Sequence, residues 1–146
     1  MIIISHRGNL NGPILEYENS PKYIDCALKE GFDVEIDVWV VEGRIYLGHD
    51  HPSVKISIDY LNSRKNNLWL HLKNSESADY FVDQLDFNYF AHQSDPYVIT
   101  SQGFIWSYPG KCSSAKKIVL MPEWEAGDQL KGATGVCTDY PFRYKS

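Results

Sequence analysis

Short apolar runs recur along the whole chain, and most of them end at a polar or ionisable residue. Runs of this length, bounded by Gly, Pro, Asn and Ser, are typical of β-strands. Eight such runs follow one another, at Ile2–Ser5, Asp33–Val41, Leu68–Leu70, Tyr89–Ala91, Tyr97–Thr100, Phe104–Trp106, Ile118–Met121 and Gly135–Cys137. The pattern therefore predicts a protein built mainly around a sheet.

Two segments have the pattern of amphipathic helices. The first covers Ser20–Gly31, with Ser at the N-cap, Pro in the first turn and Gly beyond the last turn. The second covers Ser75–Leu85 and has apolar residues at helical spacing. A weaker helical pattern covers Ser57–Arg64. We expect these helices to connect strands of the first half.

The length and the order of these elements predict one domain, residues 1–146, with one hydrophobic core. Strands that alternate with helices predict a shortened (β/α)8 TIM-type barrel, with helices missing or reduced in the second half. Such barrels usually need roughly 200 residues or more. The later gaps are also too short for crossover connections of about a dozen residues. An open α/β sheet remains the alternative.

Composition narrows the function classes. The formal net charge of −5 argues against nucleic acid or an anionic membrane as the partner, since there is no basic stripe to neutralise phosphates. No apolar stretch is long enough to predict a membrane span. The three cysteines are odd in number and lack metal-type spacing, so we expect reduced thiols and a cytoplasmic protein.

Four of the five histidines end or closely follow a predicted strand. His6, His71 and His92 follow the first, third and fourth strands, and His49 follows the short strand Arg44–Leu47. Single histidines at such positions are usually structural. In a parallel barrel, however, the strand ends meet at the face that carries the active site. We therefore expect these four side chains to share one rim.

Glu35 and Asp37 lie two residues apart in an apolar strand, so both point to the same face. On a buried face two adjacent carboxylates repel each other strongly, and a divalent cation removes that repulsion. A solvent-facing strand edge with two ordinary carboxylates is the alternative. The absence of other polar residues from Val34–Trp39 favours the metal site.

Six short motifs together resemble the glycerophosphodiester phosphodiesterases, a family related to the phosphatidylinositol-specific phospholipases C. They are His6-Arg7-Gly8, Glu18-Asn19-Ser20, Glu35-Ile36-Asp37-Val38, Gly48-His49-Asp50, Leu70-His71-Leu72-Lys73 and Thr138-Asp139-Tyr140-Pro141. The resemblance is dense in the first half of the chain and sparse between about residues 93 and 134. Each motif is weak alone, but their order and gaps match the family.

The resemblance implies that His6 and His49 are the acid and base pair and that Arg7 binds the phosphate. It also implies that Glu35 and Asp37 hold one divalent metal ion, Mg²⁺ or Ca²⁺ in the family. A phosphodiester needs these parts: a base for the attacking oxygen, an acid for the leaving oxygen, and positive charge on the phosphate. Histidine can fill either of the first two roles near neutral pH.

The chain departs from the family at His71, which stands where a third metal carboxylate is expected. A site of Glu35, Asp37 and His71 is less anionic, and the imidazole shifts its preference toward Mn²⁺ or Zn²⁺. Alternatively, His71 binds no metal, and a phospholipase C-like site works with His6, His49 and Arg7 alone. The chain is also shorter than the family's usual barrel.

Four further residues are candidates for substrate binding: Glu18, Lys73, His92 and Trp106. Alternatively, Glu18 stabilises the positive N-terminal end of a helix, and Trp106 covers the hydrophobic core. The sequence thus predicts a metal-dependent phosphodiesterase acting on a small glycerol- or sugar-type phosphodiester. The alternative is a degenerate barrel that binds a phosphorylated metabolite or partner without turnover. Uncovered strand faces also favour a homodimer.

Overall fold

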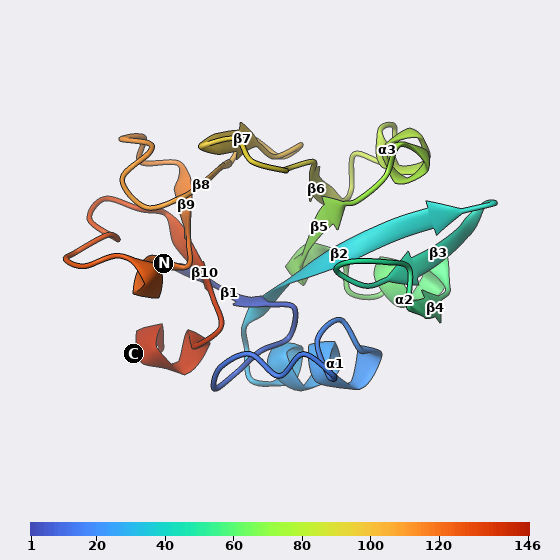
Figure 1. Cartoon of the computed structure of the whole chain (residues 1–146), viewed down its shortest axis with the longest axis horizontal. Coiled ribbons are helices and arrows are strands. Elements are labelled where there is room, and N and C mark those ends of the chain that lie inside the picture. The colour runs from blue at the N-terminus through green and yellow to red at the C-terminus, as the bar shows by residue number, and fades with distance from the viewer.

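A computed structural model describes all residues, 1–146 (Figure 1). Ten strands form a single curled mixed sheet. They are β1 (Ile2–His6), β2 (Asp33–Val41), β3 (Arg44–Leu47), β4 (Val54–Ile56), β5 (Leu68–Leu72), β6 (Asn88–Phe90), β7 (Tyr97–Ile99), β8 (Ile105–Ser107), β9 (Lys117–Leu120) and β10 (Gly135–Thr138). All eight predicted strands are present, and β3 and β4 add an antiparallel extension to β2.

The α-helices are α1 (Pro21–Lys29), α2 (Ile58–Asn62) and α3 (Ser75–Phe81). Ser20 caps α1 and Ser57 caps α2, each by accepting a hydrogen bond from a backbone N–H in the first turn. The three predicted helices are therefore confirmed, with α3 shorter than its pattern. Three 3₁₀-helices complete the elements: Lys65–Asn67, Pro122–Trp124 and Pro141–Tyr144. None of the helices has the length and apolar character needed to cross a bilayer.

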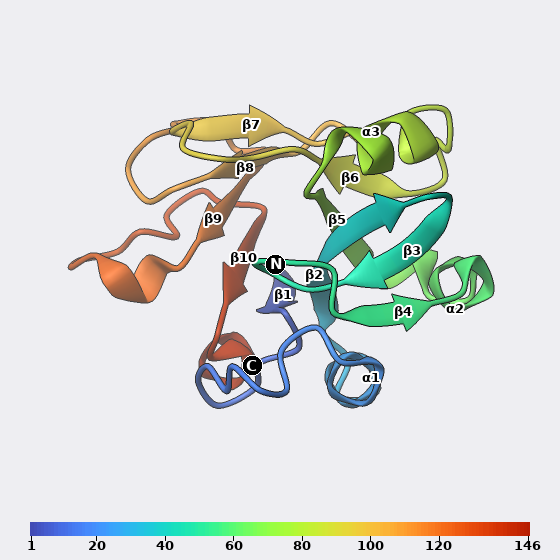
Figure 2. The ribbon, with the colours of Figure 1, turned by 45° about the vertical axis from the view of Figure 1, so that its right-hand side comes forward.

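The centre of the sheet is parallel. Its strands run in the order β6-β5-β2-β1-β10-β9-β8, and every pairing between these neighbours is parallel. The last strand beyond β8 is β7, which is antiparallel to it. Figure 2 shows the sheet curling so that β6 and β7 approach each other across the open side. The strands thus surround a common interior without forming a regular barrel.

The predicted shortened (β/α)8 TIM-type barrel is wrong. The structure is a curled, mixed half-barrel with only three short α-helices. No α-helix follows Phe81. The segments from β6 to β7, β7 to β8 and β8 to β9 are too short for a crossover helix, and the longer segment from β9 to β10 contains only the 3₁₀-helix Pro122–Trp124. The connection from β7 to β8 is a turn, so these two strands are antiparallel. The β3–β4 extension also has no counterpart in the repeating βα unit.

Two apolar clusters pack on opposite faces of the sheet. Alternate residues of β2, including Val34 and Ile36, belong to the larger cluster, which includes side chains of α1 and α3. The smaller cluster fills the interior and consists of Ile4, Trp69, Phe90, Trp106, Ile118 and Cys137. Glu35 and Asp37 occupy the other set of alternate positions of β2, on the interior face. The second cluster therefore forms the floor below the polar residues at the strand ends.

Candidate active site

Parallel pairing brings four predicted site residues to one rim. His6 at the end of β1 is in register with Glu35 of β2, and Asp37 is in register with His71 of β5. Because paired residues of neighbouring strands point to the same face, all four side chains enter the interior. The rim that the sequence predicts for four histidines thus contains His6 and His71, together with the two carboxylates of β2.

Glu35, Asp37 and His71 form a compact group of metal-ligating side chains. One ligand atom from each of the three lies within 4.8 Å of the others. Both carboxylates are buried, yet Glu35 Oε2 and Asp37 Oδ1 make no hydrogen bond. Bonds of about 2.0–2.6 Å from a cation to oxygen and nitrogen would span such separations. The geometry and the unpartnered oxygens therefore fit a divalent cation.

A backbone contact orients the His71 ring. His71 Nε2 donates to the carbonyl oxygen of His92 over 2.8 Å, so Nδ1 faces the carboxylates. Nδ1 lies 3.1 Å from Asp37 Oδ1 and 3.7 Å from Glu35 Oε1. Burial lowers the pKa of His71, but the two carboxylates outweigh it and raise this pKa to about 9. Without metal, His71 is therefore an imidazolium at neutral pH and the counter-ion of the pair.

Asp37 is the most firmly held member of the group. Its Oδ2 accepts from Asn19 Nδ2 over 2.9 Å, and its backbone N–H donates to Asn19 Oδ1 over the same distance. Arg7 Nε and Lys73 Nζ lie 3.2 and 3.8 Å from its carboxylate. Burial raises the pKa of Asp37, but His71, Arg7 and Asn19 more than offset it and hold this pKa well below its usual range. Asp37 is therefore ionised and fixed.

The turn after β1 places Arg7 and Glu18 in the site. Arg7 has a positive φ of 56°, and Gly8 follows it with a φ of 88°, a conformation that glycine adopts without strain. A Cβ at Gly8 would also lie only 3.1 Å from the Tyr23 backbone. Arg7 Nη1 pairs with Glu18 Oε2 over 3.1 Å, and Asn9 Nδ2 donates to Glu18 Oε1. Glu18 is thus part of the polar network of the site and positions Arg7.

Asp139, which directly follows the last strand, orients the His6 ring. His6 Nδ1 shares a hydrogen bond of 2.8 Å with Asp139 Oδ1, and Nε2 points the other way, 3.9 Å from Glu35 Oε2. Burial raises the pKa of Asp139, but contacts with His6 and Asn9 outweigh it and lower this pKa. Glu123 Oε1 in turn accepts from the backbone N–H of Asp139. The pair resembles the arrangements in which a carboxylate fixes the tautomer of a catalytic imidazole.

His49 lies opposite this group and outside its hydrogen-bond network. It follows β3 on an exposed loop, and its Nδ1 shares a hydrogen bond of 2.7 Å with Asp50 Oδ1. The loop is tight at Gly48, where a side chain would collide with the His51 carbonyl. The structure thus places the two predicted acid and base residues on different elements, with His6 half-buried and His49 exposed.

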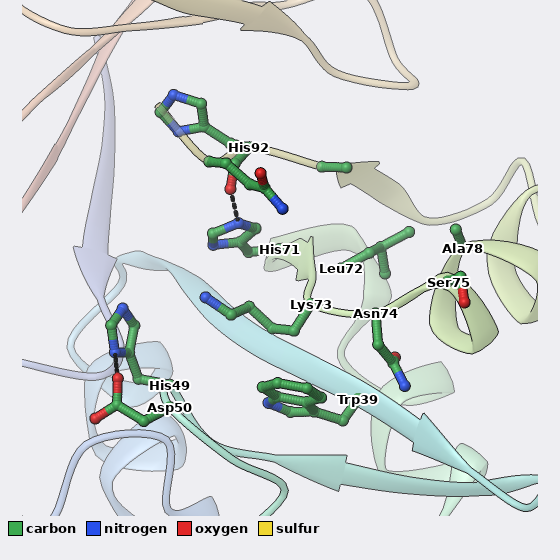
Figure 3. A pocket seen from close by; sticks show the side chains of 12 residues that line it. Trp39, His49, Asp50, His71, Leu72, Lys73, Asn74, Ser75, Ala78 and His92 are labelled. Carbon is green, nitrogen blue, oxygen red and sulfur yellow. Dashed lines mark hydrogen bonds and ion pairs between the residues drawn. The ribbon is translucent and has the colours of Figure 1, made fainter. Parts of the chain in front are cut away.

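Two adjoining pockets open above the group. One has a volume of about 330 Å³ and is lined by His6, Arg7 and Glu35 among others. The other has a volume of about 500 Å³ and extends over Trp39 toward α3 (Figure 3). Both pockets share a wall formed by His49, His71, Lys73, His92 and Gln93. Both volumes are typical of small-molecule sites.

The remaining predicted residues have different surroundings. Lys73 lines both pockets. His92 also lines both, and its Nε2 shares a hydrogen bond with the Asp95 carbonyl. Trp106 borders the smaller pocket but is only 2% exposed, and its ring packs on Phe90 at a centroid distance of 4.5 Å. Trp106 is therefore mainly a core residue beneath the pocket.

Sequence reasoning gave no site role to Asn9, Asn19 or Asp139, although two of them belong to motifs quoted above. Asn19 follows Glu18 directly and has a left-handed φ of 61°, a conformation that Asn tolerates better than most residues. Asp139 follows β10, as His6 ends the neighbouring β1. Its place directly after the last parallel strand was the signal that could have assigned it. No comparable signal marks Asn9.

Comparison with known proteins leaves the site to be interpreted from its own geometry. No family model, curated protein or solved structure matches the chain. The family resemblance of the motifs therefore stays a prediction.

Proposed function

We propose that this protein is a metal-dependent phosphodiesterase that hydrolyses a small, soluble diester of a glycerol- or sugar-type alcohol. The observation that carries the proposal is the buried Glu35–Asp37 pair, in which one oxygen of each carboxylate makes no hydrogen bond. In the metal-free protein the nearest cationic groups to these oxygens are His6, His71 and Lys73, at 3.1–3.9 Å. Such oxygens are costly unless a cation binds them. Three free cysteines agree with a reducing, cytoplasmic compartment as the site of action.

The bound metal would be held by Glu35, Asp37 and His71 and would supply positive charge for the phosphate oxygens. Mn²⁺ and Zn²⁺ join Mg²⁺ and Ca²⁺ as candidates because of the imidazole ligand. Arg7 and Lys73 add two fixed positive charges at the pocket, each also paired with Asp37. They place positive charge at the pocket although the chain as a whole has a net charge of −5.

His6 and His49 are the groups that we assign to proton transfer. His6 Nδ1 is occupied by Asp139, so His6 takes or gives a proton through Nε2, which faces the smaller pocket. His49 lines the same pocket from the β3 side. One of the two deprotonates the nucleophile, water or a substrate hydroxyl, and the other protonates the leaving alkoxide. Two histidines on separate elements suit an acid and a base at opposite sides of a phosphate.

The test is release of alcohol or phosphomonoester from a panel of phosphodiesters. The protein is first treated with a chelator and then assayed with Mg²⁺, Ca²⁺, Mn²⁺ or Zn²⁺. Turnover in the wild type should need one of these ions and fall by at least about 100-fold in His49→Ala and Asp37→Ala. His51→Ala is the matched control, because His51 is exposed on the same loop and lines neither pocket.

Three outcomes would change the proposal. Full activity after exhaustive chelation would replace it with a metal-independent site, in which the His71 imidazolium neutralises the carboxylates. Folded protein that is stabilised by phosphorylated ligands but forms no product would favour the binding module. Activity that survives Asp37→Ala would exclude the metal group from catalysis. Phosphorus NMR during turnover separates direct hydrolysis from internal attack, because only internal attack forms a cyclic phosphate.

A further inference from the structure

The larger pocket continues away from the metal group and holds none of the residues assigned to proton transfer except His49. Its volume of about 500 Å³ exceeds what a phosphate and a three-carbon alcohol require. The two pockets share a wall, so a ligand whose phosphate lies at Arg7 and Glu35 can extend one substituent into this space. The chemistry of the larger pocket therefore bears on the alcohol part of a substrate.

Trp39 forms the floor of this pocket. It lies two residues beyond Asp37 on β2, so it points to the same face at about 7 Å along the strand. Its Nε1 donates to the Gly48 carbonyl over 2.6 Å, which fixes the ring and satisfies its only polar atom. Figure 3 shows the ring at the base of the pocket, below the Lys73 side chain. A ligand therefore meets a rigid apolar surface there.

Polar groups surround this floor. Lys73 carries its amino group toward the side where His49 and His71 lie (Figure 3), while Ser75 and Gln93 are exposed elsewhere on the lining. The pocket thus combines one aromatic face with donors and acceptors around it. A sugar ring has the complementary chemistry, because its C–H groups form an apolar face and its hydroxyls point outward from the ring edge.

Other alcohol groups fit this pocket less well. A choline or ethanolamine cation would gain from the Trp39 face but would be repelled by the Lys73 ammonium, which is paired only at 3.8 Å with Asp37. Glycerol has no ring face to cover the indole. A planar nucleobase would stack on Trp39, but the polar side chains around the ring would then lack hydroxyl groups to bind. The combination favours a neutral, polyhydroxylated ring.

We propose that the pocket over Trp39 is a subsite for a monosaccharide unit esterified to the phosphate, and that Trp39 determines this specificity. The inference rests on the proposed function, since it places the phosphate in the adjoining pocket. It assigns Trp39 no part in proton transfer or metal binding.

The test is binding of methyl glycosides to metal-free protein, measured by saturation-transfer NMR. The probes are the methyl glycosides of glucose, galactose, mannose and ribose, with glycerol, choline and adenosine as comparison ligands. At least one glycoside should bind saturably and more tightly than all three comparison ligands. Trp39→Ala should weaken that binding by at least about 10-fold. Tyr97→Ala, a half-exposed aromatic on β7 outside both pockets, is the matched control and should bind like the wild type.

A second variant guards against misfolding of Trp39→Ala. Ala78→Phe fills the pocket from the exposed side of α3 and leaves the Trp39–Gly48 bond in place, so it should weaken glycoside binding to a similar extent. Absence of glycoside binding to the wild type, binding that survives both variants, or preference for choline or adenosine would overturn the subsite. Turnover of methyl p-nitrophenyl phosphate, which carries no sugar, tests the phosphodiesterase proposal separately. Either proposal can therefore fail while the other stands.

Discussion

The two halves of the sheet are built differently. Around β2 and β5 the outer face is covered by α1 and α3, and the larger apolar cluster fills the space between them. Beyond β6 no α-helix covers the strands, and Tyr97 and Ile99 of β7 are 51% and 70% exposed. One sheet therefore combines a two-layered half with a half that is mostly a single layer.

The site belongs mainly to the covered half. Arg7, Glu35, Asp37 and His71 all come from β1, β2, β5 or the turn that follows β1. Strands that are packed on both faces hold side chains more rigidly than single-layered ones, and a site with buried charges needs that rigidity. The second half contributes supports, chiefly Asp139 behind His6. The shortened half can therefore lack helices while the charged group keeps its scaffold.

The uncovered half also bears on assembly. Its apolar side chains are exposed, as expected for strand faces that no helix covers. The homodimer that the sequence favours stays a prediction. Light scattering tests it, and a monomeric mass would contradict it.

The largest expected effect is the difference in stability loss between a substitution in the covered half and one in the uncovered half. Leu70 of β5 is fully buried in the larger cluster, whereas Ile99 of β7 is 70% exposed. Leu70→Ala should lower the free energy of unfolding by about 2–5 kcal/mol because it leaves a cavity in a packed layer. Ile99→Ala should change it by less than about 0.5 kcal/mol. Urea unfolding followed by circular dichroism measures both, and equal losses would mean that β7 is covered in solution.

Much of the covered half could be predicted from local sequence. Ser20 and Ser57 mark helix starts, and the spacing of Glu35 and Asp37 fixes their common face, because side-chain alternation and capping are local properties. The barrel prediction failed on sheet closure, which depends on contacts between residues distant in sequence, and on the short turn that makes β7 antiparallel to β8. The apolar run at Tyr97–Ile99 looks the same whether its strand is parallel or antiparallel.

The candidate site shows the same limit. Asp37 and His71 are in register because β2 and β5 are neighbouring strands. Both residues lie near the end of a predicted strand, and that position was enough to place them together. The bond between His6 and Asp139 joins residues from opposite ends of the chain and depends on β1 pairing with β10. No local pattern encodes that contact. The Asn19 clamp on Asp37 likewise depends on how the turn after β1 folds back.

The next effect tests what the second half contributes to the site. Asp139→Asn keeps the shape but removes the charge that orients His6, and its amide can turn a donor toward the ring. We expect kcat/KM for the best phosphodiester to fall about 100-fold, or about 2.7 kcal/mol in activation free energy. The basic or acidic limb of the pH profile that reports His6 should also shift.

Asp83→Asn, an exposed carboxylate between α3 and β6, is the matched control and should leave the rate and the profile unchanged. An Asp139→Asn enzyme with a lower rate but an unshifted pH profile would assign Asp139 to stability rather than to the positioning of His6.

The smallest effect concerns the charged group in the covered half and its pH dependence. In metal-free protein the pKa of His71 rises from 6.5 to about 9 on folding, so the folded state favours the protonated ring. This contribution is fully present below pH 6.5 and is lost as the pH rises through 9. We therefore expect metal-free wild type to lose about 2 kcal/mol of stability between these values, beyond any loss in His71→Gln. Urea unfolding with chelator present at both pH values measures the difference. Equal losses in the two proteins would show that His71 is not the counter-ion of Glu35 and Asp37.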